Sequence, residues 1–332
     1  MIDALIDYGL FLAKALTIVL AIGAVLMIVM RSRKGQRLDG DRLEIVNLND
    51  KYRSMKRALK RASLPKKALL KVLKADKKAD KQRRKSDKGE HRRRVFVVDF
   101  HGDIKATEVG SLREVVTGVL MEAGEKDEVL VRLENAGGIV TEHGLAASQL
   151  ARLRTRKVPL TIAVDKVAAS GGYLMACVAD RIIAAPFAAV GSIGVVAQLP
   201  NFHRALERNG IDFELHTAGE YKRTLTLFGE NTEAGREKLQ QQLEDTHVLF
   251  KDFIKEYRPD VDLGRIATGE YWHGRQALDL GLVDEIKTSD DYLLEASREA
   301  DIYLVSYEGR KRPIERLLSA IADGALRAVT RA

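Results

Sequence analysis

The chain has 332 residues, of which 45% are hydrophobic, and a formal net charge of +8. This length is enough for one large domain or two modest ones with a hydrophobic core. The single cysteine, Cys177, excludes an intramolecular disulfide. No cluster of Cys, His and carboxylate residues has metal-ligand spacing, so the sequence predicts no metal site.

The charge is unevenly distributed along the chain. Residues 31–94 contain 25 Lys and Arg against 8 Asp and Glu, whereas residues 95–332 contain 29 against 37. A basic segment therefore precedes an acidic globular part.

An apolar run near the N-terminus covers residues 8–30 and is interrupted by one charge, Lys14. At about 1.5 Å per residue, a helix of this length spans a hydrocarbon core roughly 30 Å thick. A cleaved signal peptide is the alternative, but the acidic start (Asp3 and Asp7) and the basic residues after the run favour an uncleaved transmembrane anchor. The same basic residues place the C-terminal bulk in the cytoplasm by the positive-inside rule.

Residues 31–94 are predicted to form a basic juxtamembrane linker with helices over 50–60 and 65–85. Three roles are open for this linker: a solvated spacer, a patch on anionic lipid headgroups, or a nucleic-acid arm. Its position next to the anchor favours the first two. Because a basic run alone gives only nonspecific attraction to phosphate, we expect no specific nucleic-acid partner.

From residue 95 onward, strand-like and helix-like patterns alternate. This alternation predicts an α/β fold with largely parallel strands, right-handed crossovers and helices covering the sheet. A capping box, Ser111 to Glu114, predicts the start of the first helix. The predicted strands are 95–100, 128–133, 160–164, 181–185, 212–217 and 282–286, and the predicted helices are 111–123, 141–156, 171–179, 201–209, 232–257 and a short one from 275. Residues 313–332 are amphipathic, which is typical of a helix packed on the domain or on a neighbouring subunit.

One hydroxyl, that of Ser170, lies among alanines and glycines directly after the strand predicted at 160–164. Small neighbours clear space around an Oγ atom, and glycines let a substrate backbone approach. Two interpretations are open: Ser170 is a nucleophile, or it only caps the following helix. A second glycine turn, at 137–138, also follows a predicted strand. Because parallel sheets place reactive groups on loops at strand ends, this second turn favours the nucleophile.

A serine nucleophile needs a base. His101, His143 and His216 are conceivable bases, but none lies in a motif-like setting. The alternative base is a lysine whose pKa is lowered by desolvation. Lys222, beside Tyr221 and after a predicted strand, is the candidate; a solvated loop lysine is the other interpretation.

Several strings resemble the signal peptide peptidase A family of membrane-anchored serine proteases, and within it the SohB-type peptidases. The similarity runs from the predicted anchor to about residue 290. The matching strings are YGLFLAK at 8–14, VDKVAASGGY at 164–173, VGSIGVV at 190–196, HTAGEYKRTLTL at 216–227, GENT at 229–232 and GLVDE at 281–285.

This resemblance implies a role for each matching residue. Ser170 is implied to be the nucleophile and Lys222 the general base, while Ser192 holds the lysine amine in place; a buried turn serine is the other interpretation of Ser192. The backbone N–H groups of Gly138 and Gly171 are implied to form the oxyanion hole. The implied fold is that of Clp protease and crotonase, built from repeated ββα units, and the implied chemistry needs no metal or organic cofactor.

One motif departs from the family pattern. Relatives usually have Ser-Pro-Gly-Gly where this chain has Asn135-Ala136-Gly137-Gly138. Proline fixes φ near −65° before the glycines, so its absence at Ala136 predicts a looser loop with the oxyanion hole retained.

The resemblance implies a serine endopeptidase anchored in the inner membrane by a single pass. It would form a homo-oligomer, contact lipids through the anchor and basic linker, and cleave peptides such as signal-peptide remnants or misfolded and membrane-associated polypeptides. Family analogy places the catalytic domain in the periplasm, against the charge bias. A non-catalytic membrane scaffold and a crotonase-like acyl-CoA enzyme are the alternatives. The expected organisation is an anchor at 1–30, the linker at 31–94, a peptidase domain at 95–300, and a strand and amphipathic helix at 301–332.

Overall fold

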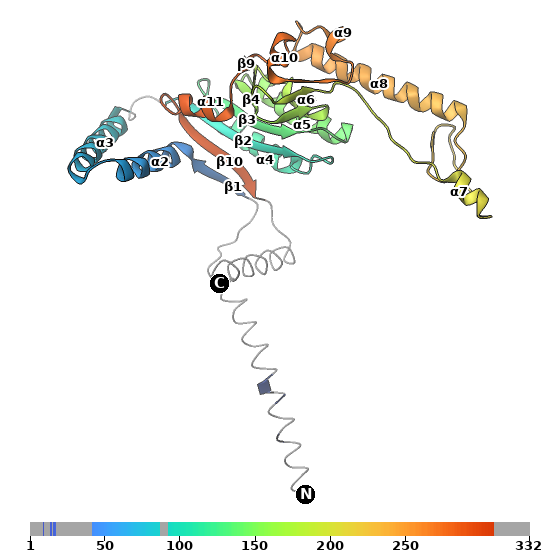
Figure 1. Cartoon of the computed structure of the whole chain (residues 1–332), viewed down its shortest axis with the longest axis horizontal. Helices are drawn as coiled ribbons and strands as arrows, with labels where there is room; N and C mark the ends of the chain where they lie inside the picture. Colours follow the sequence, from blue (N-terminus) through green and yellow to red (C-terminus); the bar gives the residue numbers. More distant parts are fainter. Residues whose placement is uncertain (1–8, 10–13, 15, 18–41, 87–91, 309–332) are drawn as a thin grey trace. The chain divides into compact units, whose positions relative to one another are not determined.

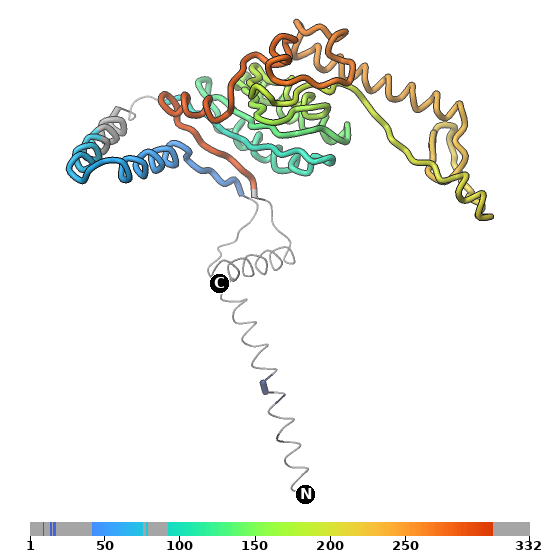
Figure 2. Tube along the Cα trace, in the orientation of Figure 1, coloured from blue at the N-terminus to red at the C-terminus, as the bar shows by residue number. Residues whose placement is uncertain are grey.

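The computed structural model describes residues 9, 14, 16, 17, 42–86 and 92–308 (Figure 1; Figure 2). Apart from four of its residues, the predicted anchor at 8–30 lies outside the described residues, as does all of the amphipathic segment at 313–332. Among the residues that are described, no helix is both long and apolar enough to span a membrane. The chain divides into two compact units, and the unit Leu43–Tyr307 contains α2 to α11 and nearly all of the sheet.

A sheet of ten strands organises the described part of the chain. Its main path runs β1-β10-β2-β3-β4-β6-β9, and β5, β7 and β8 branch from β3. The parallel pairs are β10–β2, β2–β3, β3–β4, β4–β6, β6–β9, β3–β5 and β5–β7, and β7–β8 is antiparallel. The predicted α/β class with largely parallel strands is therefore confirmed. The strand bounds are β1 Arg42–Asn47, β2 Arg94–Gly102, β3 Glu128–Asn135, β4 Leu160–Val164, β5 Val167–Ala169, β6 Arg181–Ala184, β7 Ala189–Gly191, β8 Tyr271–His273, β9 Glu285–Ile286 and β10 Asp301–Glu308.

Alternate residues of the central strands supply two separate apolar layers. In β2, Phe96 and Val98 join the larger core, which includes residues of α4 (Val109–Glu122), α5 (Val140–Thr155) and α6 (Gly171–Ala176). Val95 and Val97 join a smaller core with residues of α11 (Ser289–Ala296) and the start of α2 (Leu48–Ser63). Because successive strand residues point to opposite faces, one apolar run covers both faces of the sheet.

The branch β5-β7-β8 positions the Ser170 turn. β3 pairs with β4 from Val129 to Arg132 and with β5 at its last residue, where Asn135 aligns with Ala168. β5 then pairs with β7, and Ala169 aligns with Gly191. The carboxyl ends of β3, β5 and β7 therefore meet at one point.

Segments from both ends of the described chain complete the sheet. The linker helices are present as α2 and α3 (Lys66–Ser86), close to their predicted limits. At the start of α2, the Asn49 side chain donates to the Ser297 and Ala300 carbonyls at 3.3 and 3.1 Å and accepts from the Ile302 N–H at 2.7 Å. These bonds join α2 to α11 and β10.

Some element boundaries differ from the prediction. The prediction of a helix start with a capping box at Ser111 is wrong. The helix α4 begins at Val109, directly after Glu108, and Ser111 lies inside it. The strand predicted at 212–217 is absent, since every residue from 211 to 221 is exposed and has no apolar layer to cover. The strand predicted at 282–286 is reduced to β9, and α6 ends at Ala176. The remaining helices are α7 His203–Arg208, α8 Glu233–Tyr257, α9 Leu263–Ile266 and α10 Gly274–Asp279.

Residues 196–245, here called the arm, connect β7 to the second half of α8 and carry α7 (Figure 1). No residue of the arm is buried. Its internal packing includes three aromatic rings: Phe228 lies 6.1 Å from Phe202 and 5.8 Å from Phe213, measured between ring centroids. The arm therefore has local contacts but no core of its own.

Candidate functional site

Ser170 lies at the turn between β5 and α6 in an unusual backbone conformation. Its φ is 53° and its ψ is −120°, outside the regions that a residue with a Cβ atom readily adopts. Its N–H donates to the Gly191 carbonyl at 2.8 Å, which ties the turn to β7. The side chain makes no capping hydrogen bond to α6, although Ser170 occupies the position before the helix. The helix-capping interpretation is therefore not supported, and strained backbone of this kind is often found at functional sites.

A cavity of about 280 Å³ opens at Ser170. Its walls come from the loop after β3, from α5 and α6, from the segment after β7, and from the second half of α8. The lining residues are Gly138, Val140, His143, Gly144, Ser148, Ser170, Gly171, Leu174, Gly194, Val195, Thr246, Leu249, Phe250 and Phe253. No lining side chain is a carboxylate, lysine or arginine, so the cavity suits an uncharged, mainly apolar group.

The loop after β3 contacts the loops after β2 and β5 so closely that three glycines leave no room for a Cβ atom. A Cβ on Gly137, which has φ of 89°, would lie 2.7 Å from Cβ of Ser170. A Cβ on Gly172 would collide with the carbonyl oxygen of Asn135, and one on Gly138 with the carbonyl oxygen of Ile104. The glycines are thus required by the close approach of two backbones.

Two buried polar residues stand behind these loops. The Oδ1 atom of Asn135 accepts from the N–H of Gly137 at 2.8 Å. The ring of His143, which is fully buried, lies 3.2 Å from the same Oδ1 atom through Nε2. The loop that lacks the proline is therefore held by a side-chain hydrogen bond, which the prediction of a looser loop did not include. Asparagine two residues before a turn amide is a known turn signal that could have indicated this bond.

Ser192 directly follows β7, as Ser170 directly follows β5. Since Ala169 aligns with Gly191, the two serines are the next residues on neighbouring strands. Ser192 also has a positive φ, 51°, and its N–H donates to the Glu270 carbonyl at 2.6 Å. The structure thus brings Ser192 to the Ser170 turn, together with Gly138 and Gly171.

Lys222 is not brought to this cavity. It lies in the arm, is exposed, and is not among the lining residues. Its backbone N–H donates to the Gly219 carbonyl at 3.2 Å. The neighbouring Tyr221 is 51% exposed and has Lys238 Nζ 5.0 Å from its ring centroid. A single copy of the chain therefore does not desolvate the Lys222 ammonium group.

The rings of two of the three candidate histidines, His143 and His216, have other polar partners. His216 is exposed and its Nε2 lies 3.2 Å from the Glu214 carboxylate. His101 is exposed on β2. Both ring nitrogens of His143 lie close to oxygen atoms. Nε2 is near Asn135 Oδ1, and Nδ1 is 3.0 Å from the Ile139 carbonyl oxygen. Within the described ranges, no hydrogen bond joins any of these rings to Ser170.

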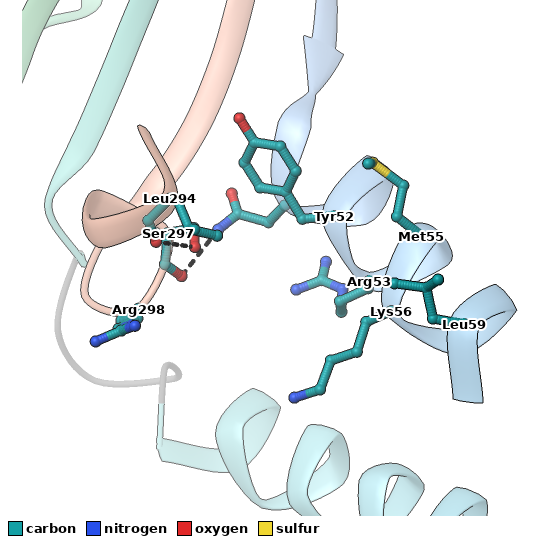
Figure 3. Close-up of a pocket in the computed structure, with 9 residues that line it drawn as sticks. Tyr52, Arg53, Met55, Lys56, Leu59, Leu294, Ser297 and Arg298 are labelled. Carbon is teal, nitrogen blue, oxygen red and sulfur yellow. Dashed lines mark hydrogen bonds between the residues drawn. The ribbon is translucent and has the colours of Figure 1, made fainter. Parts of the chain in front are cut away.

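A second hollow, of about 490 Å³, lies between α2 and the end of α11 (Figure 3). Figure 3 shows Met55, Leu59 and Leu294 at this groove together with the cationic side chains of Arg53, Lys56 and Arg298. Its other lining residues are Asn49, Tyr52 and Ser297. In the part of the chain that the structure describes, no group of three or more His, Cys, Asp or Glu side chains could hold a metal ion.

Known families and proteins match nearly the whole chain. The model of the peptidase family S49 N-terminal region matches residues 3–150, and the model of peptidase family S49 matches residues 152–303. The probable protease SohB of Haemophilus influenzae is 46% identical over 339 aligned residues, covering 99% of this chain and 96% of that protein. The probable protease SohB of Buchnera aphidicola from Schizaphis graminum is 45% identical, covering 97% of this chain and 95% of the relative.

Among solved structures, a mutant of the 1510-N membrane-bound stomatin-specific protease aligns with a TM-score of 0.42 at 14% identity. The alignment covers 62% of this chain and 85% of that one.

Proposed function

Because the chain is a SohB-type member of peptidase family S49, and thus a serine-type peptidase, we propose that it is a membrane-anchored endopeptidase with a Ser170–Lys222 dyad. The observation that carries the proposal is the position of Ser170. Its strained turn opens onto an apolar cavity between two glycine loops, and its hydroxyl does not cap the helix. A peptide with a small or apolar side chain at the cleaved bond fits such a cavity.

The proposed mechanism is acyl transfer. The neutral amine of Lys222 takes the proton from Ser170 Oγ as that oxygen attacks the peptide carbonyl carbon. The N–H groups of Gly138 and Gly171 stabilise the negative charge on the carbonyl oxygen. Lys222 then protonates the leaving amine as the peptide C–N bond breaks. A water molecule gives a proton to the same lysine and attacks the acyl carbon, and the lysine returns that proton to Ser170 Oγ as the ester bond breaks. Ser192 accepts a hydrogen bond from the lysine amine and orients it.

Lys222 reaches Ser170 only from a second copy of the chain in this proposal. Two observations support this arrangement: Lys222 is exposed and does not line the cavity of its own chain, and no residue of the arm is buried. An arm that exposes Ile211, Phe213 and Leu215 at 54, 43 and 48% can become stable by packing on a partner. Docking would also remove water from Lys222, and burial disfavours the charged form of an amine.

Complementation between two inactive variants tests this arrangement. Ser170→Ala and Lys222→Ala are each expected to lower turnover of a fluorogenic peptide by more than about 10³-fold, and the double variant by no more than either one. When the two single variants are co-expressed, half of the chains supply a serine and half supply a lysine. Random assembly then restores about one active site in four.

Two outcomes would contradict the proposal. Substantial activity in either single variant removes that residue from the dyad. Full inactivity of the co-expressed pair, with both chains folded and co-purifying, means that the lysine acts within its own chain. Labelling of Ser170 by a fluorophosphonate in the wild type, and its loss in Ser170→Ala, checks the nucleophile independently of any substrate.

The remaining parts of the chain fit an anchored enzyme. We propose a single-pass anchor at 8–30 in the inner membrane, the basic linker at 31–94, the peptidase domain at 95–300 with a Clp protease/crotonase-like fold, and a C-terminal segment at 301–332. The cationic and apolar groove of α2 in Figure 3 supports lipid contact by the linker.

A further inference from the structure

The loop that carries Gly138 is held by Asn135. This asparagine is the last residue of β3 and is 1% exposed. Its Oδ1 atom accepts from the Gly137 N–H at 2.8 Å, and its Nδ2 atom lies 3.3 Å from the Met175 sulfur. A backbone N–H can only donate, so the contact with Gly137 identifies the Asn135 atom as the amide oxygen. This short bond fixes the direction of the chain just before Gly138.

His143 makes the next contact in the same network. Its Nε2 atom lies 3.2 Å from Asn135 Oδ1. Because that oxygen is an acceptor, the contact is a hydrogen bond when His143 carries a proton on Nε2 and donates it. The Ile139 carbonyl, 3.0 Å from Nδ1, is also an acceptor, so a neutral ring donates to one of these two oxygens, and the clamp uses the form with the proton on Nε2. The ring is fully buried in the first turn of α5, and no charged side chain lines the cavity that it faces. A donor with this degree of burial is costly to leave without a partner.

The same ring also supports the second glycine loop. A Cβ atom on Gly171 would lie 2.5 Å from Cγ of His143. The imidazole therefore packs directly behind Gly171 on one side and holds Asn135, and through it the Gly137–Gly138 turn, on the other. The two amides that the proposed function assigns to the oxyanion hole thus have one common support.

We propose that Asn135 and His143 form a clamp that sets the distance between the Gly138 and Gly171 N–H groups. In this role the clamp restricts the loop through hydrogen bonds, whereas a proline at position 136 restricts the loop by fixing φ. Both residues are positioning residues, since they act through the two loops and not on the substrate. The inference rests on the proposed function, because it needs an oxyanion hole to position.

The clamp predicts a specific kinetic defect. In His143→Phe, an aromatic ring still packs behind Gly171 but the donor to Asn135 is lost. We expect kcat to fall by about 10- to 100-fold with KM within about 2-fold, because the displaced donors act on the transition state more than on the bound substrate. Affinity for a peptide aldehyde, whose adduct with Ser170 places an oxyanion in the same hole, should fall by a similar factor.

Rescue separates a positioning role from a purely structural one. Ala136 is absent from the residues with positive φ, so a proline is compatible with the sign of its φ. The Ala136→Pro substitution should make the loop independent of the clamp. In that background His143→Phe should change kcat by less than about 3-fold.

His143→Gln, which keeps a donor, should retain more activity than His143→Phe at equal thermal stability. The matched control is His247→Phe, a histidine of α8 outside the cavity lining, which should change kcat by less than about 2-fold.

The outcomes are distinguishable. Equal losses from His143→Phe with and without Ala136→Pro, a rise in KM in place of the fall in kcat, or unchanged aldehyde affinity would each overturn the clamp. If His143→Phe does not fold, His143→Leu, which also lacks the donor, is compared with the wild type in both backgrounds and decides in the same way. Retained activity in Ser170→Ala would instead overturn the proposed function itself, whatever the His143 variants do.

Discussion

The two halves of the proposed dyad lie in regions with opposite physical character. Ser170 is held by loops that interlock so tightly that three glycines cannot carry a Cβ atom, and a buried Asn–His pair stands behind them. Lys222 lies on an arm of fifty residues, 196–245, in which none is buried. The first region is already organised for chemistry in one chain. In the proposed arrangement the second acquires its environment only on assembly, so activity is expected to depend on the concentration of the protein.

Adding a methyl group to one glycine in each region gives the largest expected contrast. Gly172→Ala would force a Cβ atom into the Asn135 carbonyl oxygen, whereas Gly210 in the arm has φ of 65° and open space around it. We expect Gly172→Ala to lower the free energy of unfolding by about 3 kcal/mol and to abolish activity. Gly210→Ala should cost about 1 kcal/mol through backbone strain alone. Urea denaturation measures both, and equal costs would remove the distinction between the regions.

A charge on the apolar surface of the arm should act on assembly and not on folding. Leu215 is 48% exposed in the arm, and Leu294 is 54% exposed on α11. We expect Leu215→Asp to weaken association and lower specific activity by about 10-fold, because an unpaired charge is costly in an apolar interface. Leu294→Asp is the matched control and should leave both unchanged. Light scattering and activity at a series of protein concentrations test this; unchanged assembly of Leu215→Asp would contradict docking of the arm.

Alkaline pH should affect the region around the sheet and leave the arm unchanged. Burial, followed by the charge of Glu128, raises the pKa of Tyr292 from 10.0 to about 12, and burial also raises the pKa of Tyr173. Above pH 10 the unfolded chain loses these phenolic protons while the folded chain keeps them. The free energy of unfolding therefore falls as pH rises from about 10 to about 12.

Denaturation by urea at several pH values measures this decline. In Tyr292→Phe the decline should be shallower, because one of the retained phenolic protons is gone. Tyr221→Phe is the control from the arm: this tyrosine is exposed, and the hydrogen bond to Glu220 is the first cause of its raised pKa. An equally steep decline in the wild type and in Tyr292→Phe would show that the buried phenol does not control the effect.

Local sequence patterns were sufficient to predict most of the helices and strands near the Ser170 turn. The apolar runs at 95–100, 128–133 and 160–164 became β2, β3 and β4, and the periodic segment at 232–257 became α8. These patterns can be recognised within short windows of sequence. A strand that is buried on both faces is a short apolar run, and a helix that is buried on one face has apolar residues every three to four positions. Motif resemblance then singled out Ser170, Gly138, Gly171, Ser192 and Lys222.

Tertiary structure alone decided which of these residues meet. The pairing of β5 with β3 and β7 brings Ser170, Ser192 and the two glycines together, because strands distant in the chain share hydrogen bonds. It also revealed the Asn135–His143 contact, which depends on a fold that brings the end of a strand against the start of a helix. The strand predicted at 212–217 did not form for the complementary reason: a β-pattern needs a neighbour and an apolar layer, and a single chain offers neither to the arm.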